Sequence, residues 1–131
     1  MIVTSPLLAG IGNLYHGFST RLGGVSEGAY ATLNLGEQVG DLPEAVRENR
    51  RRFVAALAPG VSGVVLHLAL AEANQVHGTR ILEVSEPGMA DADADALVTA
   101  TPRVAVAVRT ADCAPLLLAA QARPGRPGDL W

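Results

Sequence analysis

The sequence predicts an α+β fold, a mixed α/β sandwich, from its composition and from the order of its expected elements. Short segments typical of β-strands follow one another with only one clear helix between them, which favours a mixed sheet. The chain has 131 residues, of which 49% are hydrophobic and 18% are charged. This composition is sufficient for the packed core of one domain and argues against disorder.

The clearest helical pattern begins near Asp41 and ends before Pro59-Gly60. Asp41 and Glu44 have the spacing of a capping box, and Pro43 lies in the first turn, where a missing N–H is tolerated. Proline and glycine at positions 59 and 60 then predict the end of the helix. The side chains expected on its buried face recur at helical spacing and are Leu42, Val46, Asn49, Phe53 and Leu57.

Several other segments have the alternation or the β-branched content that is typical of strands. The first of them runs into a turn at Gly23-Gly24, whose glycines permit a positive φ. Pro87–Ala94 is expected to be a loop, and Val64–Leu70 fits either a strand or a short buried helix. The segments expected as strands are residues 15–20, Ile81–Val84, Leu97–Thr99, Val104–Val108 and Leu116–Leu118.

Charge and cysteine content limit the partners and the compartment. The formal net charge is −3, and the ten basic residues are all arginines without a continuous basic stripe, which argues against nucleic acid as a partner. The cluster Arg50-Arg51-Arg52 is expected on a solvated helix face. The chain has a single cysteine, no signal-peptide pattern, and apolar runs far shorter than the ~20 residues of a membrane span. We therefore expect a soluble cytoplasmic protein with no membrane partner.

Two positions carry side chains suited to metal binding or catalysis. His77 stands between Gln75-Val76 and Gly78, and Cys113 lies in a break between two hydrophobic segments. Strand ends and tight turns are places from which a sheet can project a reactive group, and imidazole and thiolate are favoured zinc ligands. On spacing alone, the commoner interpretation is a buried cysteine and a hydrogen-bonded histidine.

Two further patterns concern ions. Arg21 beside Gly23-Gly24 could hold a phosphate through its guanidinium and the backbone N–H groups, although a simple turn accounts for the same residues. The acidic run Asp91–Asp95 does not fit a calcium loop, because Ala96 and Pro102 stand where glycine and glutamate are needed. A solvated loop is expected there.

Several short boxes occur along the chain in a specific order, over about residues 14–118. They are His16–Arg21 with Gly23–Ser26, Leu33–Gly36, Val39–Asp41, Val46–Arg50, Gln75–Gly78, Ala94–Thr99 and Thr110–Pro115. With these boxes the sequence resembles the laccase-domain (YfiH-like) purine nucleoside phosphorylase family, formerly named multicopper polyphenol oxidases. Any one box is a weak signal, whereas the ordered set is specific.

The resemblance implies a single-domain α/β-sandwich enzyme with one zinc ion. The ligands in the family are the histidine of the Gln-Val-His box, the cysteine of the Ala-Asp-Cys box and a histidine of a later His-Ala-Gly-Trp-Arg-Gly box. His77 and Cys113 are therefore implied as metal ligands and catalytic residues. The implied reactions are phosphorolysis of adenosine, inosine, guanosine and methylthioadenosine, and deamination of adenosine. Purine nucleoside and phosphate are the implied substrates, with Arg21 expected to contact phosphate.

The sequence departs from the family pattern after Leu118. Residues 119–131 contain no histidine and are rich in proline, arginine and glycine, which predicts a divergent, disordered tail after a partial domain of residues 1–118. The C-terminal half of the family domain, with the third zinc ligand, is therefore expected to be missing, which would leave the site incomplete and the chain inactive. His16, His67 or a residue of another chain are the remaining sources of a third ligand.

Two alternative functions stay open at this point. One is a metal-independent hydrolase or deamidase, in which the Cys113 thiolate is the nucleophile and His77 its partner. The other is a truncated, non-catalytic remnant that self-associates through unpaired strands. Copper oxidation is disfavoured, because one cysteine, three histidines and two methionines are too few to ligate several copper ions in one chain.

Overall fold

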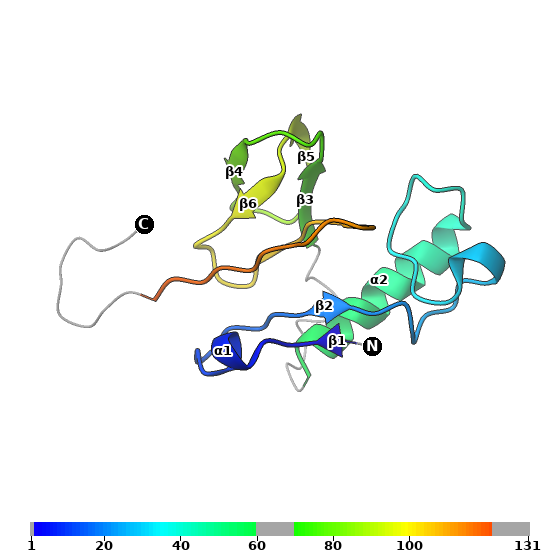
Figure 1. Ribbon diagram of the computed structural model, residues 1–131, viewed down its shortest axis with the longest axis horizontal. Coiled ribbons are helices and arrows are strands. Elements are labelled where there is room, and N and C mark those ends of the chain that lie inside the picture. Colours follow the sequence, from blue (N-terminus) through cyan, green and yellow to red (C-terminus); the bar gives the residue numbers. More distant parts are fainter. Residues whose placement is uncertain (1, 60–69, 122–131) are drawn as a thin grey trace. The chain divides into compact units, whose positions relative to one another are not determined.

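The computed structural model describes residues 2–59 and 70–121 (Figure 1). The chain divides into two compact units, Met1–His67 and Leu68–Trp131, and each is described by itself. The first contains one long helix and a short antiparallel pair of strands, and the second contains parallel strands. The predicted α+β class is therefore confirmed.

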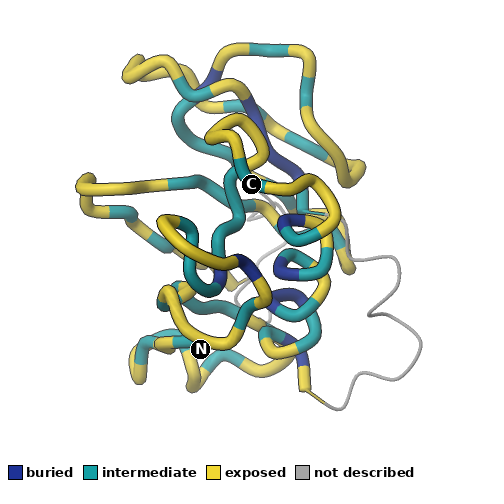
Figure 2. The backbone as a smooth tube through the Cα atoms, turned by 90° about the vertical axis from the view of Figure 1, so that its right-hand side faces the viewer, coloured by how far each residue is buried: buried dark blue, intermediate teal, exposed yellow. Residues whose placement is uncertain are grey.

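The first unit is organised around helix α2, Pro43–Leu57. Strand β1 (Ile2–Val3) pairs antiparallel with β2 (Phe18–Ser19), and the short helix α1 (Pro6–Ala9) lies between them in sequence. A 3-10 turn, η1, spans Gly28–Tyr30. Figure 2 shows that buried positions recur along one side of α2. The buried residues of this unit are Ser26, Leu33, Val46, Asn49, Phe53, Val54 and Ala58.

The predicted helix is confirmed in position, but its start differs from the capping-box expectation. Leu42 is the residue that precedes the helix, and no side chain caps the first turn. The reason is that both oxygens of the Asp41 carboxylate have other partners. Oδ2 accepts from the side chains of Ser26 and Asn34, and Oδ1 accepts from the amide of Leu42, which precedes the helix. Pro43 does occupy the first helical position.

The predicted buried face of α2 needs two corrections. Leu42 is 63% exposed because it precedes the helix, and Leu57 is only half-buried at the last turn. Val54 is buried instead, as expected for a globular helix whose apolar face is wider than a single stripe. Val46, Asn49 and Phe53 are buried as predicted.

The second unit is built on parallel strands. Strand β3 (Leu70–Asn74) lies between β5 (Gly88–Asp93) and β7 (Ala105–Val106), and it is parallel to both. Strands β4 (Ile81–Glu83) and β6 (Ala96–Val98) form a separate parallel pair. The middle of β3 is buried at three successive residues, a pattern typical of a central strand covered on both faces.

The strand predictions are confirmed in part. Strands β4, β7 and β2 lie within three of the predicted segments, although β2 and β7 are short, and β6 overlaps a fourth but begins one residue earlier. The loop predicted for Pro87–Ala94 is wrong, because β5 occupies most of it. This strand lacks β-branched residues and forms through pairing with β3, while alternate alanines are half-covered. The strand predicted at Leu116–Leu118 is also wrong, since these residues have no regular structure and Leu116 and Leu118 are 82% and 92% exposed.

Three expectations fall on residues outside the described ranges. They concern residues 64–69 of the apolar run, His67 as a ligand and residues 122–131 of the expected tail. Among the described part of the tail, residues 119–121 have no regular structure. In the described part of the chain, no helix has the length and apolar character that a membrane crossing requires.

Candidate functional site

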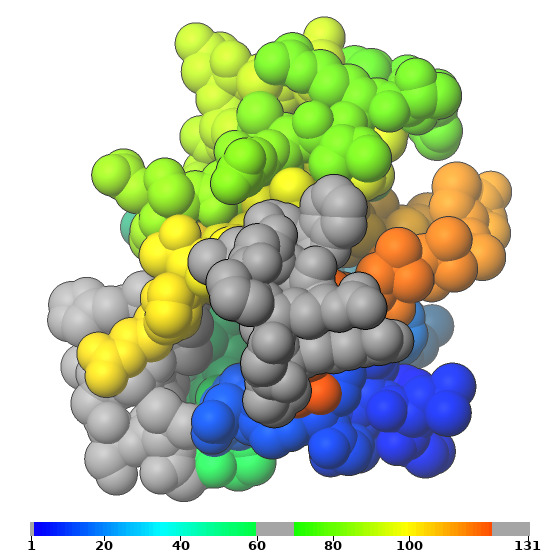
Figure 3. All heavy atoms as spheres, turned by 90° about the vertical axis from the view of Figure 1, so that its left-hand side faces the viewer, coloured from blue at the N-terminus to red at the C-terminus, as the bar shows by residue number. Residues whose placement is uncertain are grey.

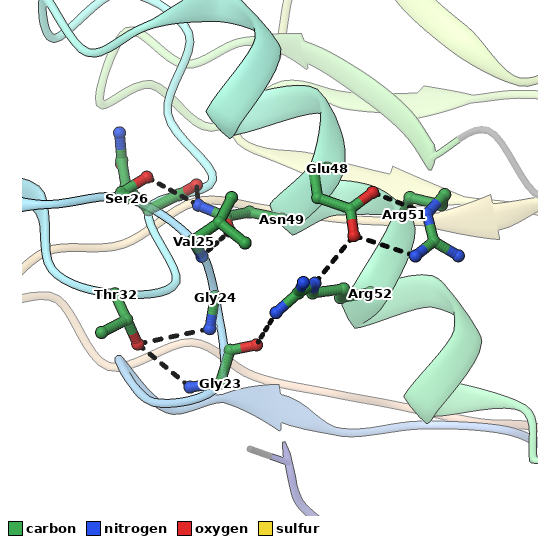
Figure 4. Close-up of polar contacts among 10 residues, drawn as sticks. Gly23, Gly24, Val25, Ser26, Thr32, Glu48, Asn49, Arg51 and Arg52 are labelled. Atoms are coloured by element: carbon green, nitrogen blue, oxygen red, sulfur yellow. Dashed lines mark hydrogen bonds and ion pairs between the residues drawn. The ribbon is translucent and has the colours of Figure 1, made fainter.

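The glycine-containing segment of the first unit, residues 21–36, is fixed to α2 by the side chain of Asn49. Asn49 has no exposed surface, and its Oδ1 accepts a 2.7 Å hydrogen bond from the Val25 amide. Its Nδ2 donates to Ser26 Oγ at 2.8 Å and to the Asn34 carbonyl at 2.9 Å. Figure 4 shows Asn49 reaching from the helix to this segment. Every polar group of this buried carboxamide is therefore used to shape the loop.

The turn at Gly23-Gly24 is closed from inside by Thr32. Both glycine amides donate to Thr32 Oγ1, at 3.0 and 3.2 Å (Figure 4). A Cβ at position 24 would overlap the Thr32 carbonyl, Asn49 Oδ1 and the Leu33 backbone, so this position requires glycine for lack of space. In this geometry the two N–H groups that could cradle an anion already have an internal acceptor.

Arg21 lies at the same turn. Its Nε and Nη2 donate to the Ala31 carbonyl at 3.0 and 2.7 Å, and its own carbonyl accepts from the amides of Thr32 and Leu33. Arg21 therefore holds the two ends of the turn together. Its expected contact with phosphate stays a prediction.

The arginine cluster on α2 is more structured than a simple solvated face. Glu48 accepts from Arg51 at 2.7 Å and from Arg52 at 2.8 Å, and Arg52 Nη1 also donates to the Gly23 carbonyl at 3.3 Å (Figure 4). The hydrogen bonds from Arg51 and then Arg52 lower the pKa of Glu48 to about 2. Arg50 pairs with Glu37 at 3.0 Å. The cluster thus ties the helix to the preceding loop.

His77 lies in an exposed turn just after β3, with a left-handed φ of +58°. The Asp95 carboxylate accepts from the backbone amides of Val76, His77 and Gly78 at 3.3, 2.9 and 2.7 Å. The bond from Gly78 is the largest effect that lowers the pKa of Asp95, while burial acts in the opposite direction. Successive amides that converge on one carboxylate form an anion-binding nest, and here that nest fixes the histidine turn.

The residue before this turn connects it to the other predicted site segment. Gln75 Nε2 donates to the Arg109 carbonyl at 2.9 Å, and the Arg109 amide donates to Gln75 Oε1 at 2.8 Å. Arg109 Nε also lies 3.5 Å from Oε1 of the buried Glu72 on β3. The chain that leads to Cys113 is thereby bound to the chain that leads to His77.

Cys113 is exposed, which corrects the interpretation of it as a buried small residue. Its Sγ lies 4.0 Å from Asp112 Oδ1. In Figure 3 the orange atoms of the segment around residues 110–118 extend away from the green atoms of β3 to β5. The thiol is therefore accessible from solvent.

The donor types at His77 and Cys113 fit a zinc ion, but the described residues do not complete its ligand set. No group of three or more histidine, cysteine, aspartate or glutamate side chains that could hold a metal occurs among them. His16 Nε2 is 2.9 Å from the Ser5 amide and 3.1 Å from the Ser5 carbonyl, so this nitrogen is already used. A zinc ion held by His77 and Cys113 would therefore need a third ligand from outside the described residues.

Two roles in this region were missed by reasoning from sequence alone. Gln75 and Asp95 both stand in the recognised boxes, yet neither was assigned a function, and the acidic run that contains Asp95 was expected to be solvated. Instead Asp95 binds three amides and Asp93 accepts from Asn74 at 2.7 Å. The Gly78 that follows His77 was a signal for a tight turn, but no local pattern indicates which carboxylate closes it.

Comparison with known proteins identifies the family of this chain. The sequence profile of the family described as multi-copper polyphenol oxidoreductase laccase matches residues 15–124. Because the match covers most of the chain, the protein belongs to this family. The matched range includes both His77 and Cys113.

Several relatives named purine nucleoside phosphorylase share up to half of the aligned residues. One from Deinococcus radiodurans is 49% identical over 104 residues, which is 79% of this chain and 38% of the relative. One from Mycobacterium tuberculosis is 50% identical over 109 residues, 82% of this chain and 40% of the relative. One from Streptomyces griseus is 42% identical over 138 aligned positions, 98% of this chain and 54% of the relative. The first two alignments thus span about two fifths of each relative's length.

A solved structure gives the same picture. The crystal structure of a Neisseria meningitidis protein of the family called DUF152 is similar with a TM-score of 0.55 and 44% sequence identity. The similarity covers 74% of this chain and 36% of that one. The fold seen here is therefore similar to about a third of that larger protein.

Proposed function

We propose that this chain supplies two ligands, His77 and Cys113, to a one-zinc site of a purine nucleoside phosphorylase. The observation that carries the proposal is the position of these residues after neighbouring parallel strands. His77 follows β3, and Cys113 follows β7, and the two strands are paired and parallel. Carboxyl ends of parallel neighbours meet at one edge of a sheet, which is where α/β proteins bind ligands.

The chemistry of the two side chains supports zinc over copper or calcium. Imidazole nitrogen and thiolate sulfur are preferred zinc donors, and a catalytic zinc uses three protein ligands with an open fourth position. When bound, zinc supplies a Lewis acid. The nest around Asp95 holds the backbone of the histidine turn, and the exposed thiol of Cys113 is accessible to a metal. The third ligand comes from a histidine outside the described residues.

The substrates are proposed from the names of the relatives and from the family resemblance. They are purine nucleosides (adenosine, inosine, guanosine and methylthioadenosine) with phosphate, and adenosine for deamination. Arg21 is the proposed phosphate contact, although phosphate would have to compete with the Ala31 carbonyl for two of its N–H groups. The protein is proposed to act in the cytoplasm.

The test uses release of hypoxanthine from inosine by the 131-residue chain, alone and with a segment of a longer relative that contains the later histidine box. Activity is expected to depend on phosphate and on zinc and to be lost in His77→Ala and in Cys113→Ala. The exposed Thr79→Ala in the same turn is the control. Phosphate-independent hydrolysis that survives chelation but is lost on Cys113 alkylation would replace this proposal with the Cys-His hydrolase. Complete inactivity with self-association in both preparations would favour the non-catalytic remnant.

A further inference from the structure

The turn that carries His77 is supported from both sides by one short segment, residues 93–96. On one side the Ala94 amide donates to the Asn74 carbonyl at 3.0 Å, and on the other the Asp95 amide donates to the Arg80 carbonyl at 3.2 Å. Between these two points the Asp95 carboxylate binds three amides of the turn. The turn is therefore closed around a single side chain.

This support has an energetic reason. A non-glycine residue in the left-handed region is less stable than in the right-handed region, because its Cβ approaches the following carbonyl oxygen. The φ of His77 is +58°, and the hydrogen bonds from its own amide and from Gly78 to a charged acceptor offset that cost. Without Asp95, the turn would lose the interaction that favours this backbone conformation.

A second set of hydrogen bonds sets the register between the segment that leads to His77 and the segment that leads to Cys113. In the pairing of β3 with β7, Leu70 lies opposite Ala105 and Ala71 lies opposite Val106. The Ala107 amide then donates to the Ala71 carbonyl at 3.0 Å. Beyond the end of β3, the Gln75 side chain replaces the backbone as the partner of the neighbouring segment, because its carboxamide both donates to and accepts from the backbone of Arg109. A primary carboxamide reproduces the donor and acceptor of a peptide group, so the side chain extends the pairing past the strand.

We propose that Gln75 and Asp95 are positioning residues for the ligand pair: Asp95 sets the backbone of the His77 turn, and Gln75 sets its register against the segment that ends at Cys113. The proposal rests on the proposed zinc site for its purpose, but the two hydrogen-bond sets exist without metal. Residues that orient metal ligands in this way typically change metal affinity 10- to 100-fold when they are replaced. Neither residue is proposed to touch metal or substrate.

The closing experiment measures geometry and metal affinity separately in the full chain. A nitroxide label on Cys113, the single cysteine, reports its distance to the backbone amides of residues 76–78 through paramagnetic broadening without any metal. In unlabelled protein, the thiolate-to-metal absorption of added Co²⁺ reports affinity. The variants are Gln75→Ala and Asp95→Asn, and the control is Thr79→Ala, which is exposed and outside both hydrogen-bond sets.

We expect broadening at residues 76–78 in the wild type and in Thr79→Ala, and a loss of broadening in Gln75→Ala. In Asp95→Asn we expect faster amide exchange at His77 and Gly78. Both variants should weaken Co²⁺ binding about 10- to 100-fold. The proposal is overturned if both match Thr79→Ala in broadening, exchange and affinity. If the wild type binds no Co²⁺ but the expected broadening from the nitroxide label is observed, the proposed zinc function is wrong, whereas the positioning role of Gln75 and Asp95 is supported.

A control for folding keeps the result interpretable. The Ala107 amide should stay slow to exchange wherever β3 and β7 remain paired. If Gln75→Ala loses that protection, Gln75→Glu replaces it, because glutamate keeps the size and the acceptor for the Arg109 amide but lacks the donor. We then expect partial loss of the broadening at residues 76–78, and broadening equal to that of Thr79→Ala would overturn the proposal.

Discussion

Asn49 and Val25 are joined by a 2.7 Å hydrogen bond between a fully buried side-chain oxygen and a backbone amide of a loop 24 positions earlier. The other side of the same carboxamide binds Ser26 and Asn34. The shape of residues 21–36 therefore depends on one polar residue in the buried face of α2.

Asn49→Ala should destabilise the first unit by about 2–4 kcal/mol. Loss of the carboxamide leaves the Val25 amide and the Asn34 carbonyl without this partner in a partly buried region, and unsatisfied buried groups cost about 1–3 kcal/mol each. Urea unfolding followed by NMR signals of α2 residues measures the change. Arg47→Ala, on the exposed face of the same helix, is the control. Equal stability of the two variants would contradict the role given to Asn49.

Gly24→Ala should also be destabilising, and Gly10→Ala should not. A Cβ at Gly24 would overlap three groups of the loop and of Asn49, whereas a Cβ at Gly10 meets nothing within 4 Å, and its φ is −76°. Forced overpacking costs typically 1–3 kcal/mol. Thermal unfolding of both variants provides the comparison. A tolerated Gly24→Ala would mean that the loop is not packed as described.

Acid should lower the free energy of unfolding of the first unit over a pH range that is set by the pKa of Glu48. Its folded pKa, about 2, lies below the ordinary value of 4.5, so its contribution to stability is fully present above about pH 4.5 and is lost as the pH falls toward 2. Asp41, whose pKa is lowered mainly by the hydrogen bond from Ser26, acts in the same direction. Urea midpoints of wild type and Glu48→Gln should converge as the pH falls through this window. A constant difference between them would show that Glu48 is not ion-paired in solution. High salt should reduce the effect because the pair is exposed.

Phosphate added to the chain should shift the backbone NMR signals of Gly23 and Gly24 if Arg21 contacts that anion. The expected mechanism is competition with the Ala31 and Thr32 acceptors, which now occupy the guanidinium and the two amides. Arg21→Gln should abolish the shifts. Unchanged signals in the wild type up to concentrations that saturate phosphorylases would remove Arg21 from the site.

The sequence predicted those parts of the fold whose signal is local. Helix α2 has both a terminal proline and a helical apolar pattern, and β4 and β6 each contain adjacent apolar residues, so all three were located to within a few residues. Strand β5 was missed because Gly88–Asp93 has low intrinsic strand propensity, and its conformation is decided by pairing with β3. Propensity cannot predict an element that depends on a neighbour.

His77 and Cys113 as ligands stay a prediction, and the residues that hold their segments in place were not predicted from the sequence. His77 and Cys113 have distinctive chemistry and stand in recognisable boxes. Gln75 and Asp95 act through hydrogen bonds to residues 17 to 34 positions away, and such pairings are set by the fold. Asp41 shows the converse, since the capping pattern pointed to the helix amides while Ser26 and Asn34 bind its carboxylate.

Zinc binding by purified 131-residue protein, measured by competition with a chromophoric chelator, tests the central claim most directly. With the segment of a longer relative that contains the later histidine box added to supply the third ligand, the account predicts one zinc ion per chain. Binding should be weakened at least tenfold in His77→Ala and also in Cys113→Ala, and unchanged in Thr79→Ala. Zinc bound with wild-type affinity by both single variants would show that these two side chains do not share a metal ion.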